Sequence, residues 1–137
     1  DAAMRKMKAD NPDLDFILVP GDLLGHGINL DLHRPPTPLQ AVASYALLMK
    51  THRDVAKLLE THFPNIPVLP TFGNNDTKYH YQPAHDSRKD KADKNKEPFY
   101  TEMIDTWFTK HTGNKNLNNL ANIQATMHQL YLIHIRS

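Results

Sequence analysis

Two short apolar runs, each followed by glycine, stand out in the pattern of hydrophobic and polar positions along this chain. The first is Phe16–Val19, three of whose four residues favour β-structure, and the Pro20-Gly21 pair ends it abruptly. The second is Ile66–Phe72, which leads into Gly73-Asn74-Asn75-Asp76. We therefore predict a buried strand at the first run and a second strand at Ile66–Leu69 within the later one, each followed by a polar loop.

Between these runs, residues 38–62 carry apolar residues at steps of three and four, which predicts one long helix. Thr37 is placed to act as its N-cap, and Pro38 occupies the first helical position. The apolar stripe that we expect to face the sheet comprises Leu39, Val42, Ala46, Met49, Val55, Leu58 and Leu59. His52 and His62 match no motif, so we interpret both as structural or surface residues.

The order strand, helix, strand implies a right-handed crossover between two parallel strands. Asp22 and Asn74, which follow these strands, should then lie at the same edge of the sheet. An aspartate after Gly21 is also an ordinary turn residue, and a simple capping role is the alternative for Asp22. Carboxylate and amide oxygens are hard ligands that divalent cations accept, and the two oxygens of Asp22 are able to bridge two ions. That pairing suggests phosphate ester chemistry.

Helical patterns are found on both sides of this unit. Residues 1–9 are one-sided enough for a short surface helix. Pro98 should begin an amphipathic helix ending at Thr112-Gly113, with a shared apolar face of Phe99, Met103, Trp107 and Phe108, where Trp107 is a core residue rather than a ligand contact. A further helix and a terminal strand-like run are expected after it, with apolar positions at Leu117, Leu120, Ile123 and Met127 and from Leu130 to Ile135.

The composition of the chain excludes several classes of protein but does not identify one. With 39% hydrophobic residues the 137-residue chain has enough apolar side chains for an ordinary core, and its formal net charge of +1 supplies no field to attract nucleic acid. There is no cysteine, which excludes a zinc finger, and no apolar run near the ~18 residues of a membrane-spanning helix. In the charged segment 77–98, acidic residues almost cancel the basic ones, so we expect a solvated loop; its alternative is a lid over the site.

The sequence resembles a calcineurin-like metallophosphoesterase, most clearly over residues 1–80. The resemblance rests on Gly21-Asp22 with His26 four residues later and on Gly73-Asn74-Asn75-Asp76. The Gly-Asp-x-x-x-His spacing is similar to that of acid sphingomyelinase-like phosphodiesterases, and the Gly-Asn-Asn-Asp block to their endopolyphosphatase branch. The resemblance implies the fold of this family, a partial α/β sandwich with parallel strands and flanking helices.

The resemblance also implies roles for four residues and a set of cofactors. Asp22 would bridge two divalent ions, most readily zinc, with manganese or iron as alternatives, and Asn74 would bind the second ion. His26 matches the histidine that contacts the phosphate and assists proton transfer. Asn75 stands where many relatives have a histidine that protonates the leaving group. The substrate would be a phosphorylated small molecule, lipid or polyphosphate, and the location secreted, lysosomal or vacuolar.

The sequence departs from that family pattern by what it lacks. No Asp-x-His precedes Asp22, and no Gly-His-x-His occurs near the end of the chain. We therefore expect residues 1–137 to be a fragment of a single domain, with core strands and crossover helix over 1–76, the charged segment over 77–98 and helices with a last strand over 99–137. On its own it should have no appreciable hydrolase activity. The alternative is a non-catalytic α/β binding module with a degenerate phosphoesterase fold.

Overall fold

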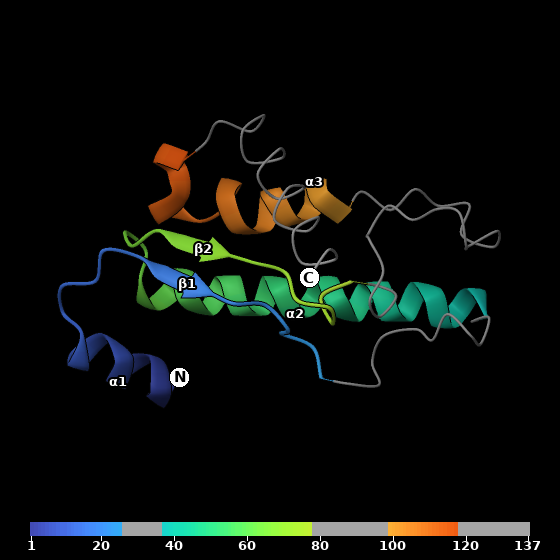
Figure 1. The fold of residues 1–137 in the computed structure, drawn as a ribbon, viewed down its shortest axis with the longest axis horizontal. Helices are drawn as coiled ribbons and strands as arrows, with labels where there is room; N and C mark the ends of the chain where they lie inside the picture. Colours follow the sequence, from blue (N-terminus) through green and yellow to red (C-terminus); the bar gives the residue numbers. More distant parts are fainter. Residues whose placement is uncertain (26–36, 78–98, 118–137) are drawn as a thin grey trace.

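The computed structural model describes residues 1–25, 37–77 and 99–117, and Figure 1 shows their arrangement. The elements follow one another as a helix, a strand, a long helix, a strand and a cluster of short helical segments. Their bounds are α1 (Ala2–Asp10), β1 (Ile17–Val19), α2 (Pro38–His62), β2 (Val68–Pro70), α3 (Phe99–Ile104), the π-helix η1 (Asp105–Thr109) and the 3₁₀-helix η2 (Thr112–Leu117).

β1 and β2 form a parallel two-stranded sheet, as the strand, helix, strand order predicts. Ile17 pairs with Val68 and Val19 with Pro70. The ladder continues to Thr71, whose backbone N–H donates to the carbonyl of Val19 at 2.8 Å. This parallel pairing confirms the α/β class and places the ends of both strands at one edge of the sheet.

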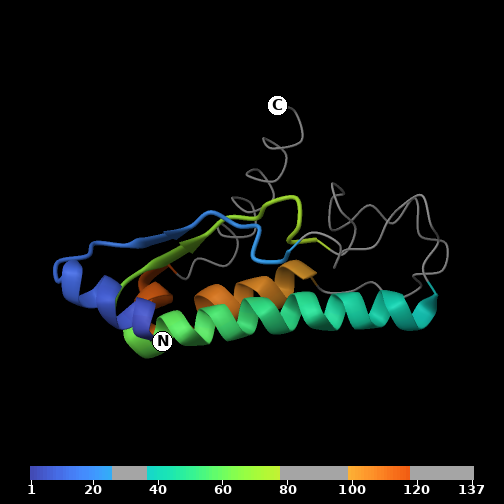
Figure 2. The same ribbon diagram turned by 90° about the horizontal axis from the view of Figure 1, so that it is seen from below.

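Only one face of this sheet is covered by the described residues. Val19 and Val68 are buried, whereas Phe16 and Leu18 are 54% and 57% exposed. Figure 2 shows α2 and α3 on the same side of the sheet. The prediction that the first strand is buried is therefore wrong for the face that carries Leu18. Successive side chains of a strand point to opposite faces, and the helices pack on the other face.

The bounds and the N-cap of α2 agree with the prediction. Thr37 accepts the N–H of Gln40 at 3.2 Å, and the Gln40 side chain accepts the N–H of Thr37 at 2.8 Å, which forms a capping box. The expected apolar stripe is wrong in the N-terminal half of the helix, where Leu39 is 78% exposed and Val42 is also exposed. The buried line instead passes through Leu48, Met49, His52, Ala56 and Leu59.

α3 and η1 supply the other half of the core. Phe99, Met103, Trp107 and Phe108 are all buried, so the predicted shared face and the core position of Trp107 are confirmed. The helix ends earlier than expected, because its last turn widens into the π-helix η1. There the N–H of Lys110 donates to the carbonyl of Asp105, five residues earlier, at 3.0 Å.

At the outer edge of β2, a side chain bonds the backbone groups of Val68. Because Pro67 and Thr71 bond to β1, the N–H and C=O of Val68 point to the opposite edge. Asn114 of η2 meets both groups: its Oδ1 accepts the N–H of Val68 at 2.8 Å, and its Nδ2 donates to the carbonyl of Val68 at 2.7 Å. Nδ2 also donates to the carbonyl of Trp107 at 2.6 Å, so one buried amide joins η2, η1 and β2.

Several predictions fall outside the described residues: His26, the charged segment from residue 78 onward, and the helix and strand expected after Leu117. Among the residues that are described, no helix is long and apolar enough to cross a membrane.

Candidate metal centre

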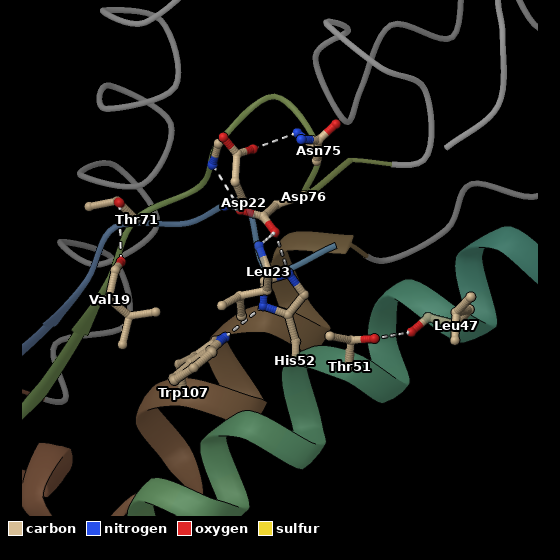
Figure 3. A network of polar contacts seen from close by, with 11 residues as sticks. Val19, Asp22, Leu23, Leu47, Thr51, His52, Thr71, Asn75, Asp76 and Trp107 are labelled. Atoms are coloured by element: carbon tan, nitrogen blue, oxygen red, sulfur yellow. Dashed lines mark hydrogen bonds and ion pairs between the residues drawn. The ribbon is translucent and has the colours of Figure 1, made fainter. Parts of the chain in front are cut away.

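The loops that follow β1 and β2 are joined by a direct hydrogen bond. The backbone N–H of Asn75 donates to Oδ1 of Asp22 at 2.8 Å (Figure 3). Asp22 is exposed, so its carboxylate stands at the surface where the two strand ends meet. The sequence-based expectation that residues 22 and 74 lie at one edge agrees with this contact, which is made by the neighbour of Asn74.

Glycine is required where these loops touch. A Cβ on Gly73 would lie 2.2 Å from Oδ1 and 2.3 Å from Cγ of Asp22. A Cβ on Gly21 would lie 2.4 Å from the backbone nitrogen of Gly73, and Gly21 has a φ of +88° that favours glycine in any case. Asp22 itself has a φ of +54°, in the left-handed region that aspartate tolerates better than most residues. The Gly-Asp loop after β1 and the Gly-Asn loop after β2 therefore pack closely because each begins with glycine.

Asp76 is the residue that gathers the two loops together. Its side chain is 0% exposed, and its Oδ2 accepts the N–H of Asp22 at 2.5 Å and the N–H of Gly73 at 2.8 Å. Its Oδ1 accepts the N–H of Leu23 at 2.9 Å. Three backbone donors from two segments therefore share one buried carboxylate. Asp22 also accepts a backbone N–H, that of Asn75, so the capping alternative for Asp22 stays open.

The pKa of Asp76 is lowered from its ordinary value of 3.8. Burial acts to raise the pKa, but the facing ring of His52 and the N–H groups of Gly73 and Leu23 favour the carboxylate and outweigh burial. Asp76 is therefore ionised inside the protein. With both of its oxygens engaged by backbone groups, it is an organiser of the loops rather than a ligand for an ion.

Two more buried side chains extend from Asp76 into the helices. Nε2 of His52, on α2, lies 3.4 Å from Oδ1 of Asp76, and the indole N–H of Trp107, on η1, donates to Nδ1 of His52 at 3.3 Å. The sequence analysis predicted Trp107 as a core residue and His52 as a structural or surface residue, and it gave Asp76 no role. The burial of His52 had a signal in the sequence: it lies four residues after Leu48 and four before Ala56, on the buried side of the helix.

The predicted site residues occupy different environments. Asp22 is exposed, Asn74 is partly buried, and Asn75 is buried, with its backbone N–H making the contact to Asp22. His26 lies outside the described residues. The roles assigned to these four residues remain predictions.

Two of the side chains at this edge carry oxygen donors of the type that divalent ions accept. An exposed carboxylate held in place by a backbone N–H, with an asparagine one residue before that N–H, offers the oxygen ligands that hard cations take. Across residues 1–25, 37–77 and 99–117 no group of three or more His, Cys, Asp or Glu side chains is placed to hold a metal ion. Binding of an ion by Asp22 and Asn74 therefore stays a prediction.

Comparison with known proteins identifies the family. The sequence model of the calcineurin-like phosphoesterase family matches residues 1–135, which extends well past the 80 residues on which the resemblance rests. No curated protein and no solved structure matched the chain.

Proposed function

Since this chain belongs to the calcineurin-like phosphoesterase family, whose members carry out metal-dependent hydrolysis of phosphoesters, we propose that its loops after β1 and β2 form one edge of a two-metal centre. The hydrogen bond from Asn75 N–H to Asp22 Oδ1, 2.8 Å long, supports this proposal most directly. It fixes the carboxylate of Asp22 beside Asn74, the second proposed ligand. Asp22 would bridge two ions, and Asn74 would bind one of them through its amide oxygen.

Bound divalent ions supply two things in such a centre: they lower the pKa of a water molecule and they stabilise negative charge on phosphate oxygens. The chain's own residues prepare the place. Asn75 N–H fixes the orientation of the Asp22 carboxylate, and Asp76 fixes the backbone on both sides of it. His26 is the proposed phosphate contact and proton donor.

The substrate that we propose is a phosphoanhydride or phosphodiester of the kind cleaved by the sphingomyelinase-like and endopolyphosphatase-like branch. Asn75 replaces a histidine expected in many relatives, and an amide donates a hydrogen bond but does not deliver a proton near neutral pH. A phosphate leaving group needs protonation less than an alkoxide does. This favours polyphosphate over a choline phosphodiester, and zinc is the ion that we propose for the centre.

Further parts of this proposal concern the protein as a whole. By its resemblance to that branch we propose a secreted, lysosomal or vacuolar location. We also propose that residues 1–137 alone have no appreciable hydrolase activity, and that zinc or manganese leaves their melting temperature unchanged. The physical reason is that two oxygen donors without further charged ligands hold a divalent ion weakly.

The test compares hydrolysis of polyphosphate and of a choline phosphodiester by the full-length protein with added zinc. We expect faster hydrolysis of polyphosphate, and a loss of at least about a hundredfold in kcat/KM for Asp22→Asn, which keeps the size of the side chain but removes its charge. Asp54→Asn is the matched control, because Asp54 is exposed on α2 and pairs only with Lys50 among the described residues. Faster lipid hydrolysis would reject the substrate, and an inactive protein that binds phosphorylated ligands would favour the binding-module alternative.

A further inference from the structure

Three buried side chains connect the two helices to the loops of the candidate metal centre. They are Trp107, His52 and Asp76, with exposed fractions of 0%, 1% and 0%. Figure 3 shows them in line, from η1 through α2 to the loops that follow the strands. We propose that Trp107 and His52 are positioning residues, which hold Asp76 in the orientation that sets the two loops. We call the three residues the Trp107–His52–Asp76 relay.

Hydrogen-bonding chemistry gives this relay a direction. An indole N–H only donates, so Nδ1 of His52, which receives it at 3.3 Å, must present a lone pair. The ring proton then resides on Nε2, which faces Oδ1 of Asp76 at 3.4 Å. Nε2 is buried and makes no hydrogen bond within the described part of the chain. Oδ1 of Asp76, 3.4 Å away, is the acceptor toward which its N–H can turn.

The relay acts on the same carboxylate that orders the loops. Oδ1 of Asp76 faces His52 and also accepts the N–H of Leu23, while Oδ2 accepts the N–H groups of Asp22 and Gly73. A rotation of the Asp76 carboxylate would disturb all of these bonds together. The ring of His52 prevents that rotation, because Trp107 fixes the ring in turn.

The packing around His52 would suit an apolar residue, so the hydrogen-bonding capacity of its ring nitrogens needs an explanation. The ring lies edge-on to Phe72 and Trp107, with centroid distances of 5.9 and 6.0 Å. Burying an imidazole in such surroundings costs free energy unless its nitrogens are used. Trp107 lies in the π-helix η1, a rare conformation that is frequently found at functional sites.

This inference rests on the proposed function only in that the loops carry the proposed metal ligands. Its test needs neither metal nor substrate: amide hydrogen exchange and imidazole ¹⁵N shifts, measured by NMR on the full chain. In the unsubstituted protein the ¹⁵N shifts should show the ring proton of His52 on Nε2. A proton on Nδ1 would overturn the relay, and this result requires no variant to fold.

The variant for hydrogen exchange is His52→Leu, which replaces the imidazole by an apolar side chain of similar size. We expect the amides of Asp22, Leu23 and Gly73 to lose about tenfold or more in protection, while the amide of Phe63, bonded to Leu59 at the end of α2, changes less than about twofold. His52→Gln, whose terminal NH₂ replaces the Nε2 donor, should restore most of that protection.

Two outcomes would overturn the inference: an equal loss at Phe63 and at the loops, which describes an ordinary core residue, or no loss at the loops. If His52→Leu does not fold, Trp107→Phe replaces it. That change keeps an aromatic ring but removes the indole donor together with part of the ring volume, so the His52 ring should acquire a population with the proton on Nδ1. A ring proton that stays wholly on Nε2 in Trp107→Phe would contradict the relay. Because none of these readouts involves hydrolysis, their failure and an inactive enzyme are separate results.

Discussion

The backbone N–H of Asn75 donates to Oδ1 of Asp22 at 2.8 Å, although the two residues are 53 positions apart in the sequence. The contact exists because β1 and β2 are parallel and in register, so the loops after them leave the sheet side by side. It brings an exposed carboxylate next to a segment rich in amide groups. We call this contact between the two loops the junction. The candidate metal centre lies at the junction, with Gly21 and Gly73 beside it and the buried carboxylate of Asp76 beneath it.

Replacing Gly73 by alanine should destabilise the junction. The new Cβ would lie within 2.3 Å of two carboxylate atoms of Asp22, so the aspartate must move. We expect a loss of about 1–3 kcal/mol in the free energy of unfolding, measured by urea denaturation. Gly25→Ala is the matched control, since a Cβ at Gly25 meets nothing within 4 Å. Equal stability of the two variants would show that the loops are not in contact in solution.

Asp76→Asn should cost about 3 kcal/mol of stability, because one acceptor oxygen becomes an NH₂ group that faces backbone donors. The measurement is the denaturant midpoint at constant m-value. Asp54→Asn, on the exposed face of α2, should change the free energy of unfolding by less than about 0.5 kcal/mol. A near-neutral Asp76→Asn would mean that the carboxylate does not hold the loops.

The sequence predicts the bounds of the helices and strands better than it predicts which side of each one is buried. The capping box at Thr37 and the following threefold and fourfold steps define α2 to the residue at both ends. Leu39 and Val42 fit the same periodicity yet are exposed, because which side of a helix is covered depends on what packs there. The strands were located within one or two residues by their apolar runs and by the prolines and glycines around them.

The candidate site shows the same limit. Asp22 and Asn74 were singled out because each follows a strand, and parallel pairing brings their loops together. Asp76 was missed because four consecutive loop residues give no sign of which one turns inward. Trp107 was predicted as a core residue and His52 as a structural or surface residue. Their link to Asp76 joins α2, η1 and a loop that are distant in the sequence, and periodicity within one element cannot reveal it.

Asn114 should be among the most sensitive positions outside the site. Asn114→Ala removes the partners of the Val68 N–H and C=O and of the Trp107 C=O, for a loss of about 3 kcal/mol by denaturation. Asn114→Asp keeps the acceptor for Val68 but sets a carboxylate against two carbonyls, so it should be destabilised as well. Asn65→Ala, at an exposed position, is the control. Stability unchanged in Asn114→Ala would contradict this role of Asn114 at the β2 edge.

Stability should fall as the pH drops through the ordinary pKa of histidine, in part because of His111. Burial lowers the pKa of His111, and the nearby carboxylate of Glu60 offsets this only in part. The unfolded chain therefore binds a proton near pH 6.5 that the folded protein binds only at lower pH, so this contribution is complete above about 6.5 and is lost below it. His111→Gln should show a smaller decrease in melting temperature between about pH 7.5 and 5.5; an unchanged slope would exclude His111 as a cause.

The most direct test of the central claim is anomalous X-ray diffraction from crystals of the full-length protein grown with zinc. If residues 22 and 74 share a metal centre, anomalous peaks will lie about 2.0–2.2 Å from a carboxylate oxygen of Asp22 and from the amide oxygen of Asn74. Zinc bound elsewhere, with neither Asp22 nor Asn74 in contact with an ion, would contradict the account.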